Sequence, residues 1–381
     1  MAFRSIRAAL IVATSLAAYA AYPARAQTAD TLNTLSPAEK HAGWTLLFDG
    51  VDKDAHWRVG EKGATNTWKV EDHALASADQ GNELFTREAY SDFEFAFEWK
   101  LSKAGNSGAF FRVNPDVGRF CSSSEYAILD DENGDDRTAL GHMPGQTMMP
   151  IKRTGACYDL YPTTTEGDND SPYVAYAKPY DQWNRGVIWA EGKHIEHWLN
   201  GRKVVDYSVR SADWNARFQA SKYPKDSRCA AQLDNWMGST TGLLGLQDHG
   251  GGLLVWYRNL KVRPFTPGGK LSSPVAIPPA GKYSGATAVK LEAGITGAVI
   301  RYTLDGSEPG PASPIYSQPI TLAKSATVKA KTFRDRFLAS DAASAAYEIG
   351  TVALAPRPKR GKTLKRVFRY HRADGRKAAK G

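Results

Sequence analysis

The sequence Ile195-Glu-His-Trp-Leu-Asn-Gly-Arg-Lys-Val-Val-Asp-Tyr207 predicts a β-hairpin. Its Asn200-Gly201 pair is typical of a two-residue hairpin turn, because both central residues of such a turn adopt positive φ. Strand-like segments flank the turn at 195–199 and 203–207, and similar patterns occupy 93–99, 187–189 and 253–262. Many short strands separated by Gly and Asn turns predict an all-β protein, a sandwich or jelly roll.

Helix signals are few and short. Ser36-Pro37-Ala38-Glu39 has the N-cap, the proline at the first helical position and the glutamate of a capping box. Ser211 is a second candidate N-cap, for a helix of one or two turns through Phe218. Neither segment is long enough to change the all-β prediction.

The chain changes character near residue 257. All ten tryptophans and all three cysteines precede this point, and the 381 residues allow two or three domains. Residues 265–273 are rich in Pro, Gly and Ser and predict a linker, followed by a second all-β segment at 274–350. Because such a linker implies few crossing contacts, we expect the first domain, 27–264, to be stable and active alone.

The net charge of +9 comes from the two ends of the chain. Residues 1–26 hold three arginines and no acid, and residues 356–381 hold eleven Lys or Arg and one Asp. The remainder has four more acidic than basic residues, so nucleic acid is not an expected partner. Residues 351–381 predict a disordered basic tail, which we expect to contact an anionic envelope surface electrostatically.

Residues 1–26 resemble a cleaved signal peptide, with Arg4 and Arg7 before an apolar run and Ala24-Arg25-Ala26 as the cleavage site. We therefore expect a periplasmic or secreted protein. Export permits disulfides. Cys121, Cys157 and Cys229 allow three alternative single bridges, and their spacing does not choose among them.

Several kinds of site are not indicated by the sequence. It has no glycine-rich phosphate loop, no G-x-S-x-G, no H-E-x-x-H and no cysteine pair at zinc spacing. His194 and His197 are three apart, which places them on opposite faces of a strand. The acidic run at 130–136 does not fit a calcium loop and is interpreted as a solvated loop. No metal site is therefore predicted.

Three segments combine strand patterning with polar side chains. In the segment 105–112, Asn106 and Arg112 are predicted to share one strand face with Gly108 and Phe110. The segment 125–130 begins with Glu125, a carboxylate among otherwise apolar residues. In 245–250, Gln247 and His249 are expected to project together. Taken singly, each polar residue has a structural explanation. Taken together, they predict a sugar-sized polar ligand on a sheet.

Seven ordered segments resemble the 3-keto-disaccharide hydrolase family over about residues 43–264. They are 44–50 (WTLLFDG), 105–112 (GNSGAFFR), 125–131 (EYAILDD), 154–159 (TGACYD), 196–201 (EHWLNG), 245–250 (GLQDHG) and 257–263 (YRNLKVR). The resemblance implies a concanavalin/laminin-G-like jelly roll acting on 3-keto-glycosides. Family members usually carry Gln where this chain has Ala127. Residues 300–316 and 328–330 resemble the small β-sandwich at the C-terminus of chitobiases, an accessory module.

The resemblance implies chemistry next to a ketone. A ketone at C3 acidifies the C2 proton, so a base removes it, the C1 oxygen leaves and water adds to the enone. Glu125 and His249 are the predicted acid/base groups, and Arg112 is expected to stabilise the enolate or bind hydroxyls. Asn106, Gln247 and Tyr158 are predicted to hydrogen-bond the sugar, and Lys152 to polarise the ketone. No cofactor is expected, although a divalent metal assisting the enolate stays open. The alternative is a lectin-like binding protein without turnover.

Overall fold

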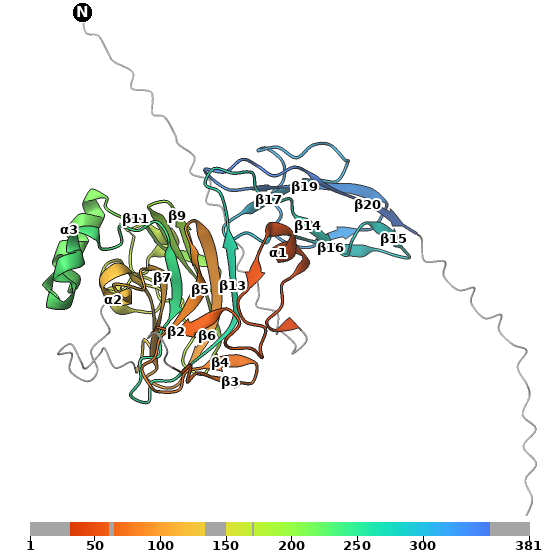
Figure 1. The fold of residues 1–381 in the computed structure, drawn as a ribbon. Coiled ribbons are helices and arrows are strands. Elements are labelled where there is room, and N and C mark those ends of the chain that lie inside the picture. Colours follow the sequence, from red (N-terminus) through yellow and green to blue (C-terminus); the bar gives the residue numbers. More distant parts are fainter. Residues whose placement is uncertain (1–30, 61–64, 134–149, 170, 351–381) are drawn as a thin grey trace, which may run out of the picture.

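The computed structural model describes residues 31–60, 65–133, 150–169 and 171–350. The predicted signal peptide and basic tail lie outside these residues. The described chain forms two β units (Figure 1). No helix within the described ranges combines the length and the hydropathy needed to cross a bilayer.

The first unit is a sandwich of two antiparallel sheets. The larger sheet has the order β11-β10-β9-β6-β13-β4-β3, with β1 paired to β13, and the smaller has the order β2-β5-β12-β7-β8. The bounds of the larger sheet are β1 Thr45–Leu46, β3 Lys69–Glu71, β4 Ala74–Ala76, β6 Phe93–Leu101, β9 Asn184–Glu191, β10 His194–Leu199, β11 Arg202–Ser208 and β13 Val255–Pro264. Those of the smaller sheet are β2 Trp57–Val59, β5 Leu84–Tyr90, β7 Asn106–Val113, β8 Glu125–Leu129 and β12 Gly242–Leu246. The predicted all-β jelly roll is confirmed.

The predicted hairpin is present as β10 and β11. Asn200 has φ 50° and Gly201 has φ 84°, the two positive values that the turn requires. Alternation along β6 directs Phe95, Phe97 and Trp99 between the sheets, where Phe97 lies edge-on to Tyr126 of β8 with centroids 5.2 Å apart. The aromatic content noted in the sequence therefore fills the core between the sheets.

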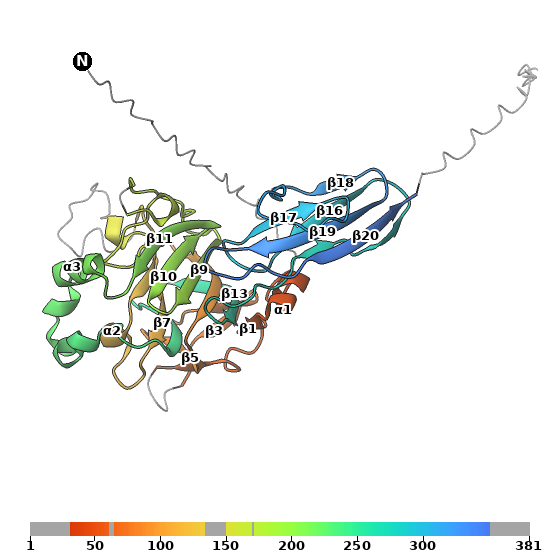
Figure 2. The same cartoon turned by 90° about the horizontal axis from the view of Figure 1, so that it is seen from above.

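Short helices lie outside the sheets. The predicted capping box begins α1 (Pro37–Ala42), and Ser211 caps α3 (Ala212–Ala220). Helix α2 (Arg119–Ser122) contacts β7 of the smaller sheet, and the 3-10 helix η6 (Ser227–Asn235) contacts α2 and the 3-10 helix η5 (Tyr223–Lys225). Two further 3-10 turns are η3 (Pro150–Lys152) and η4 (Thr165–Gly167). Helices α2 and α3 lie on the side of the sandwich away from the second unit (Figures 1 and 2).

The second unit contains two small sheets around its own core. Their orders are β14-β16-β18 and β15-β20-β19-β17. The bounds are β14 Val275–Ile277, β15 Gly281–Tyr283, β16 Thr287–Glu292, β17 Val299–Thr303, β18 Ile320–Leu322, β19 Ala326–Phe333 and β20 Ala343–Ile349. The core joins Val289, Val328 and Tyr347 from different strands. A second β-sandwich is therefore present where the sequence predicts one.

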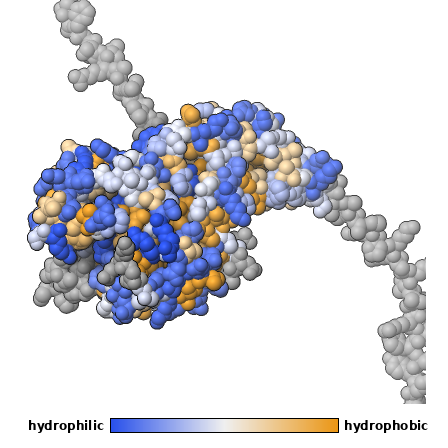
Figure 3. Space-filling view, viewed as in Figure 1, coloured by the Kyte–Doolittle hydropathy of each residue, from blue (hydrophilic) through white to orange (hydrophobic). Residues whose placement is uncertain are grey.

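The expectation of few contacts between the units is wrong. Phe265, within the predicted linker, packs against Trp189 of β9 with ring centroids 4.4 Å apart, and Leu271 is buried against the same tryptophan. Gly294 approaches α1 so closely that a Cβ there would lie 2.5 Å from the Ala38 carbonyl oxygen. The units form one continuous surface in the space-filling view (Figure 3). Proline and glycine here shape the backbone of a packed junction.

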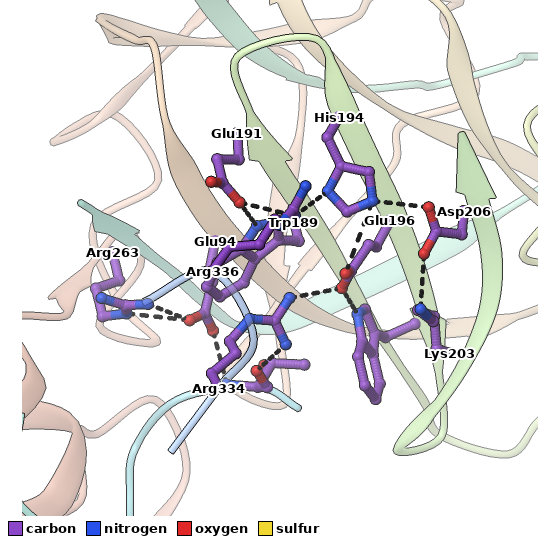
Figure 4. A network of polar contacts seen from close by, with 12 residues as sticks. Glu94, Trp189, Glu191, His194, Glu196, Lys203, Asp206, Arg263, Arg334 and Arg336 are labelled. Carbon is purple, nitrogen blue, oxygen red and sulfur yellow. Dashed lines mark hydrogen bonds and ion pairs between the residues drawn. The ribbon is translucent and has the colours of Figure 1, made fainter. Parts of the chain in front are cut away.

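Charged residues complete this junction. Glu94 binds Arg263 and accepts a hydrogen bond from the Thr296 amide, and Arg334 pairs with Glu196 at 2.8 Å. Arg336 pairs with Glu191 at 2.9 Å and contacts His194 (Figure 4). The second unit is therefore attached to the outer face of the larger sheet.

Candidate active site

A cavity of about 320 Å³ opens on the outer face of the smaller sheet. Its described lining comes from β7, α2, β8, η5, η6 and the segments beside them: Asn106, Phe110, Arg119, Phe120, Ser123, Glu125, Tyr158, Lys222, Tyr223, Arg228, Gln247 and His249. Five predicted site residues, Asn106, Glu125, Tyr158, Gln247 and His249, are thus brought together. The volume is in the range of small-ligand sites.

Glu125 begins β8, directly opposite Phe110 of β7. Its side chain lies over Gly108, where an added Cβ would be 2.7 Å from the carboxylate Oε1. Only glycine therefore leaves room for this carboxylate in its present position. The Glu125 carbonyl also accepts a hydrogen bond from the Tyr158 amide at 2.9 Å, which fixes the tyrosine beside it.

Gln247 and His249 follow the end of β12. The Gln247 amide donates to the Gly108 carbonyl at 2.9 Å, so Gln247 lies next to the space that Glu125 occupies. Buried Asp248 accepts hydrogen bonds from the amides of Gln80 and Gly250 and thereby holds the loop. His249 is exposed and lines the same cavity as Gln247.

The Gln247 side chain has an unmet hydrogen-bond capacity. It is only 6% exposed, and its Oε1 has no donor among the described residues. A buried amide oxygen without a partner carries a desolvation cost of about 1–3 kcal/mol. A ligand hydroxyl in the cavity would remove this cost.

Arg112 is not at the cavity, which corrects the prediction that it shares a face with Asn106. A register irregularity between β7 and β12 lies beside Arg112, whose φ is +54°, so the simple alternation along β7 is broken there. The guanidinium is buried and donates to the carbonyls of Ser91 and Gly192, with Asp92 at 3.6 Å. Arg112 therefore ties loops at one end of the sandwich.

Lys152 is also not among the described lining residues of the cavity. Its side chain is buried, with Nζ 5.5 Å from the centre of the Tyr158 ring, and Tyr158 itself lines the cavity. Ala127 lies on the same strand face as Glu125 but is fully buried in a cluster with Ala156 and Tyr158. The segment after residue 153 thus covers the part of this face that follows Glu125.

The sequence interpretation missed the wall formed by α2, η5 and η6. It supplies Arg119, Phe120, Lys222, Tyr223 and Arg228 to the cavity. A disulfide between Cys121 and Cys229, with an S–S distance of 2.05 Å, joins α2 to η6 and resolves the open pairing. Each bonded cysteine has an arginine within two residues, a signal that could have pointed to this wall.

Cys157 is the remaining free thiol. It is fully buried, and burial raises the pKa of its thiol to about 12. Since the thiolate is the nucleophilic form, Cys157 is unsuited to nucleophilic chemistry.

The two histidines of β10 face opposite ways, as predicted. His197 lies in the core against Tyr126, and His194 pairs with Asp206 at 2.7 Å on the outer face. His194, Glu196 and Asp206 lie close enough to hold a metal ion. Lys203, Arg334 and Arg336 already pair with this group, which makes it part of the junction network (Figure 4).

The interpretation of the acidic run as a solvated loop is wrong for its first residue, Asp130, and the second, Asp131, is only partly exposed. Asp130 is 4% exposed, and its carboxylate accepts hydrogen bonds from the amides of Ala104, Glu132 and Asn133. Asp131 accepts one from the Thr154 amide, and burial raises its pKa to about 6. These carboxylates organise backbone turns. Residues 134–136 lie outside the described residues.

An antiparallel two-sheet sandwich with a polar cavity on one sheet places the first unit in the class of jelly-roll β-sandwich proteins, which includes lectin domains. The model of the 3-keto-α-glucoside-1,2-lyase-like domain family matches residues 43–263, more than half of the chain, and the chain belongs to this family. The chitobiase/β-hexosaminidase C-terminal domain matches residues 278–344.

Individual relatives agree with this assignment. A 3-keto-disaccharide hydrolase of Bacteroides thetaiotaomicron is 27% identical over 244 residues, which cover 58% of this chain and 78% of that protein. A crystal structure of a candidate glycosyl hydrolase from Parabacteroides distasonis superposes with a TM-score of 0.52 at 29% identity, covering 62% of this chain and all of the other. The protein is a glycosidase-like enzyme with a carbohydrate substrate.

Proposed function

We propose that the protein cleaves 3-keto-glycosides by proton abstraction, elimination and hydration. The observation that carries this proposal is the convergence of Glu125 and His249 on one cavity, beside the unpartnered oxygen of Gln247. Carboxylate and imidazole are the two side chains there that exchange protons near neutral pH. The family's name and the curated relative's 3-keto substrate support the same chemistry.

Burial suggests how the roles divide. Glu125 lies over the sheet, whereas His249 is exposed at the rim where an aglycone would leave. Glu125 is the proposed base that takes the C2 proton, and the electron pair moves into the C3 enolate. The enolate then expels the C1 oxygen, to which His249 gives a proton. Water then adds its hydroxyl to C1 and gives its other proton to His249, while Glu125 returns the abstracted proton to C2, so both groups are regenerated and the net reaction is hydrolysis.

The developing enolate needs a positive partner. Arg112 cannot supply it because its guanidinium is bound away from the cavity. Arg119 lines the cavity, with its guanidinium carbon 4.6 Å from the centre of the Phe110 ring, and Phe110 is the residue opposite Glu125. Arg119 is therefore the proposed electrostatic stabiliser. Asn106, Gln247 and Tyr158 are the proposed sugar contacts.

We propose that no resident metal takes part. Among the described lining residues, Glu125 and His249 are the two with side chains that commonly bind transition metals. Catalytic zinc usually has three protein ligands, so this donor set fits a metal poorly.

The proposal is tested with the full chain and 4-nitrophenyl 3-keto-α-glucoside, by following release of the nitrophenol. Glu125→Gln and His249→Ala should each lower the rate by roughly 10²–10⁴-fold. Glu88→Gln and His41→Ala, which change exposed residues away from the cavity, are matched controls and should retain activity. Saturable binding of the compound without release of nitrophenol would contradict the proposal.

We also propose that the protein is exported and that its basic tail contacts an anionic envelope surface. The Cys121–Cys229 disulfide supports an oxidising compartment. The full chain should co-sediment with anionic vesicles to a greater extent than a 27–355 truncation. Its binding should weaken between 0.1 M and 1 M salt, because the Debye length falls from about 10 Å to about 3 Å. Equal pelleting of the two proteins would contradict the tail's role.

A further inference from the structure

One wall of the cavity carries more positive charge than the proposed reaction uses. Among the described lining residues, Arg119, Lys222 and Arg228 are cationic and Glu125 is the acidic one, while Glu83 pairs with Arg119 and Asp226 pairs with Arg228 from outside the lining. Arg119 lies beside Phe110 near Glu125, where the enolate is expected to form. Lys222 and Arg228 come from the separate η5–η6 segment, where the Asp226 carboxylate accepts hydrogen bonds from the Arg228 guanidinium.

Aromatic rings hold both of these cations at the cavity. Lys222 Nζ lies 4.2 Å from the centre of the Tyr158 ring and 5.6 Å from that of Phe120. The guanidinium carbon of Arg228 lies 4.4 Å from the centre of the same Phe120 ring. Phe120 and Tyr158 both line the cavity, so the two positive groups lie at its surface.

The backbone that carries these cations is fixed in several places. The disulfide joins Cys229 to Cys121, each next in sequence to a residue of the wall, Arg228 and Phe120. The Lys222 amide donates to the Asp159 carboxylate at 2.7 Å, and Asp226 caps η6 through the Arg228 amide. This anchored backbone keeps the attachment points of both side chains beside the cavity, so the backbone need not be ordered when an anion binds.

Arg228 also retains donor capacity. Its Nε and Nη2 donate to Asp226, whereas its Nη1 makes no hydrogen bond to any of the described residues. A guanidinium offers five N–H donors in a fixed fork that matches a carboxylate or an ester sulfate. The Asp226 carboxylate therefore leaves part of this fork available to a ligand.

We propose that the substrate is an anionic glycoside, whose carboxylate or sulfate group is bound by Lys222 and Arg228. This inference rests on the proposed function, because it assigns a substrate class to the same cavity. The acidic group would lie against the η5–η6 wall, and the ketone-bearing carbons would lie towards Glu125 and His249. A neutral glycoside would leave the two cations without a negative partner in the ligand.

Binding of glycosides without a ketone tests the charge preference independently of turnover. Methyl α-glucuronide, methyl α-glucoside and methyl α-glucoside 6-sulfate are titrated into the full chain by calorimetry at low salt. At least one anionic ligand should bind about tenfold more tightly than the glucoside, since a hydrogen bond to a charged group contributes about 1.5–3 kcal/mol. The better of the two anionic ligands identifies the carboxylate or the sulfate.

Variants connect the preference to the wall. Lys222→Gln and Arg228→Gln should each reduce the anionic preference several-fold, and the double variant should abolish it. Lys225→Gln is the matched control, because Lys225 is on η5 but donates to the Ala220 carbonyl and does not line the cavity. It should keep the preference.

Equal binding of the neutral and anionic ligands, or an unchanged preference in the double variant, would overturn this inference. If the chain cleaves a 3-keto-glucoside but binds the neutral and anionic ligands equally, the charge preference is overturned and the proposed function stands. An anionic preference that depends on Lys222 and Arg228, without cleavage of any 3-keto-glycoside, would support the preference and contradict the proposed function.

Discussion

The guanidinium of Arg334 lies over the Trp189 ring on the outer face of the first unit, with its central carbon 3.7 Å from the centre of that ring (Figure 4). Its Nη2 donates to Glu196 at 2.8 Å, and its Nη1 donates to the Thr296 carbonyl. Trp189 is fully buried, and the side chains of Arg334 and Glu196 are 8% and 7% exposed. A cation from the second unit is therefore desolvated on the larger sheet.

Arg334→Ala is expected to lower the free energy of unfolding by about 3 kcal/mol, because removing one partner of a buried ion pair leaves the other charge uncompensated. Urea unfolding measures the change. Arg336→Ala is the matched control: Arg336 is 49% exposed and its ion pair is expected to contribute less than about 1 kcal/mol. Equal effects of the two variants would contradict the special role of Arg334.

The same relationship predicts the behaviour of the isolated first unit. Truncation after residue 264 would expose Trp189 and remove Phe265 and Leu271, which cover it. A 31–264 protein should therefore unfold at lower urea concentration than the full chain and aggregate more readily. Its cavity lies away from the junction, so the fraction that remains folded should retain activity. Unchanged stability of the 31–264 protein would restore the linker interpretation.

Gly108→Ala is expected to disable the site with little loss of stability. The new methyl group would overlap the Glu125 carboxylate, whose flexible end can move aside but not remain in place. A shift of about 1 Å in a reacting group can lower the rate about 10²-fold, so kcat should fall by that order. Gly310→Ala is the control, since no atom lies within 4 Å of the Cβ it would add. Wild-type kcat in Gly108→Ala would show that the position of Glu125 is unimportant.

Gln247→Met removes the unpartnered amide oxygen while keeping the side-chain volume. KM for the 3-keto-glycoside should rise about tenfold, the size of one lost hydrogen bond to the sugar. The melting temperature should stay level or rise, because the variant no longer buries an unsatisfied acceptor. A fall in melting temperature with unchanged KM would instead assign Gln247 a structural role.

Local patterns were sufficient to predict much of the fold. The Asn200-Gly201 turn and the capping box at Ser36 depend on residues within four positions of one another, and both are present. The shared location of Gln247 and His249 also follows from a short spacing. Where the determining contacts are local, a single sequence contains them.

The remaining features depend on contacts between distant residues. Arg112 left its predicted face because of an irregular register against β12, which alternation along β7 alone does not reveal. Lys222 and Arg228 reach the cavity because a disulfide spanning 108 residues joins their segment to α2. The pairing of Arg334 with Glu196 likewise connects separate units. Composition could not distinguish this packed junction from a free linker.

Two groups, the buried His197 and the partly buried Asp131, should give the stability of the first unit opposing pH dependences. Burial among aromatic rings lowers the pKa of His197 to about 4, whereas burial raises the pKa of Asp131 to about 6. Between about pH 4 and 6.5 the unfolded chain binds more protons at His197, so this group makes stability fall as the pH falls. Between about pH 3.8 and 6 the folded chain binds more protons at Asp131, so this group makes stability fall as the pH rises.

Substitution of either residue should therefore change the slope of unfolding free energy against pH, in opposite directions. Between pH 4.5 and 5.5, His197→Phe should make the slope of unfolding free energy against pH more negative by about 1.4 kcal/mol per pH unit. The variant removes the one proton by which the unfolded chain exceeds the folded chain at this residue. Asp131→Asn should make the same slope more positive by a similar amount. Urea unfolding at several pH values measures both slopes, with His41→Ala, an exposed histidine, as the control. Parallel stability–pH curves for the wild type and both variants would mean that neither group titrates differently in the folded chain.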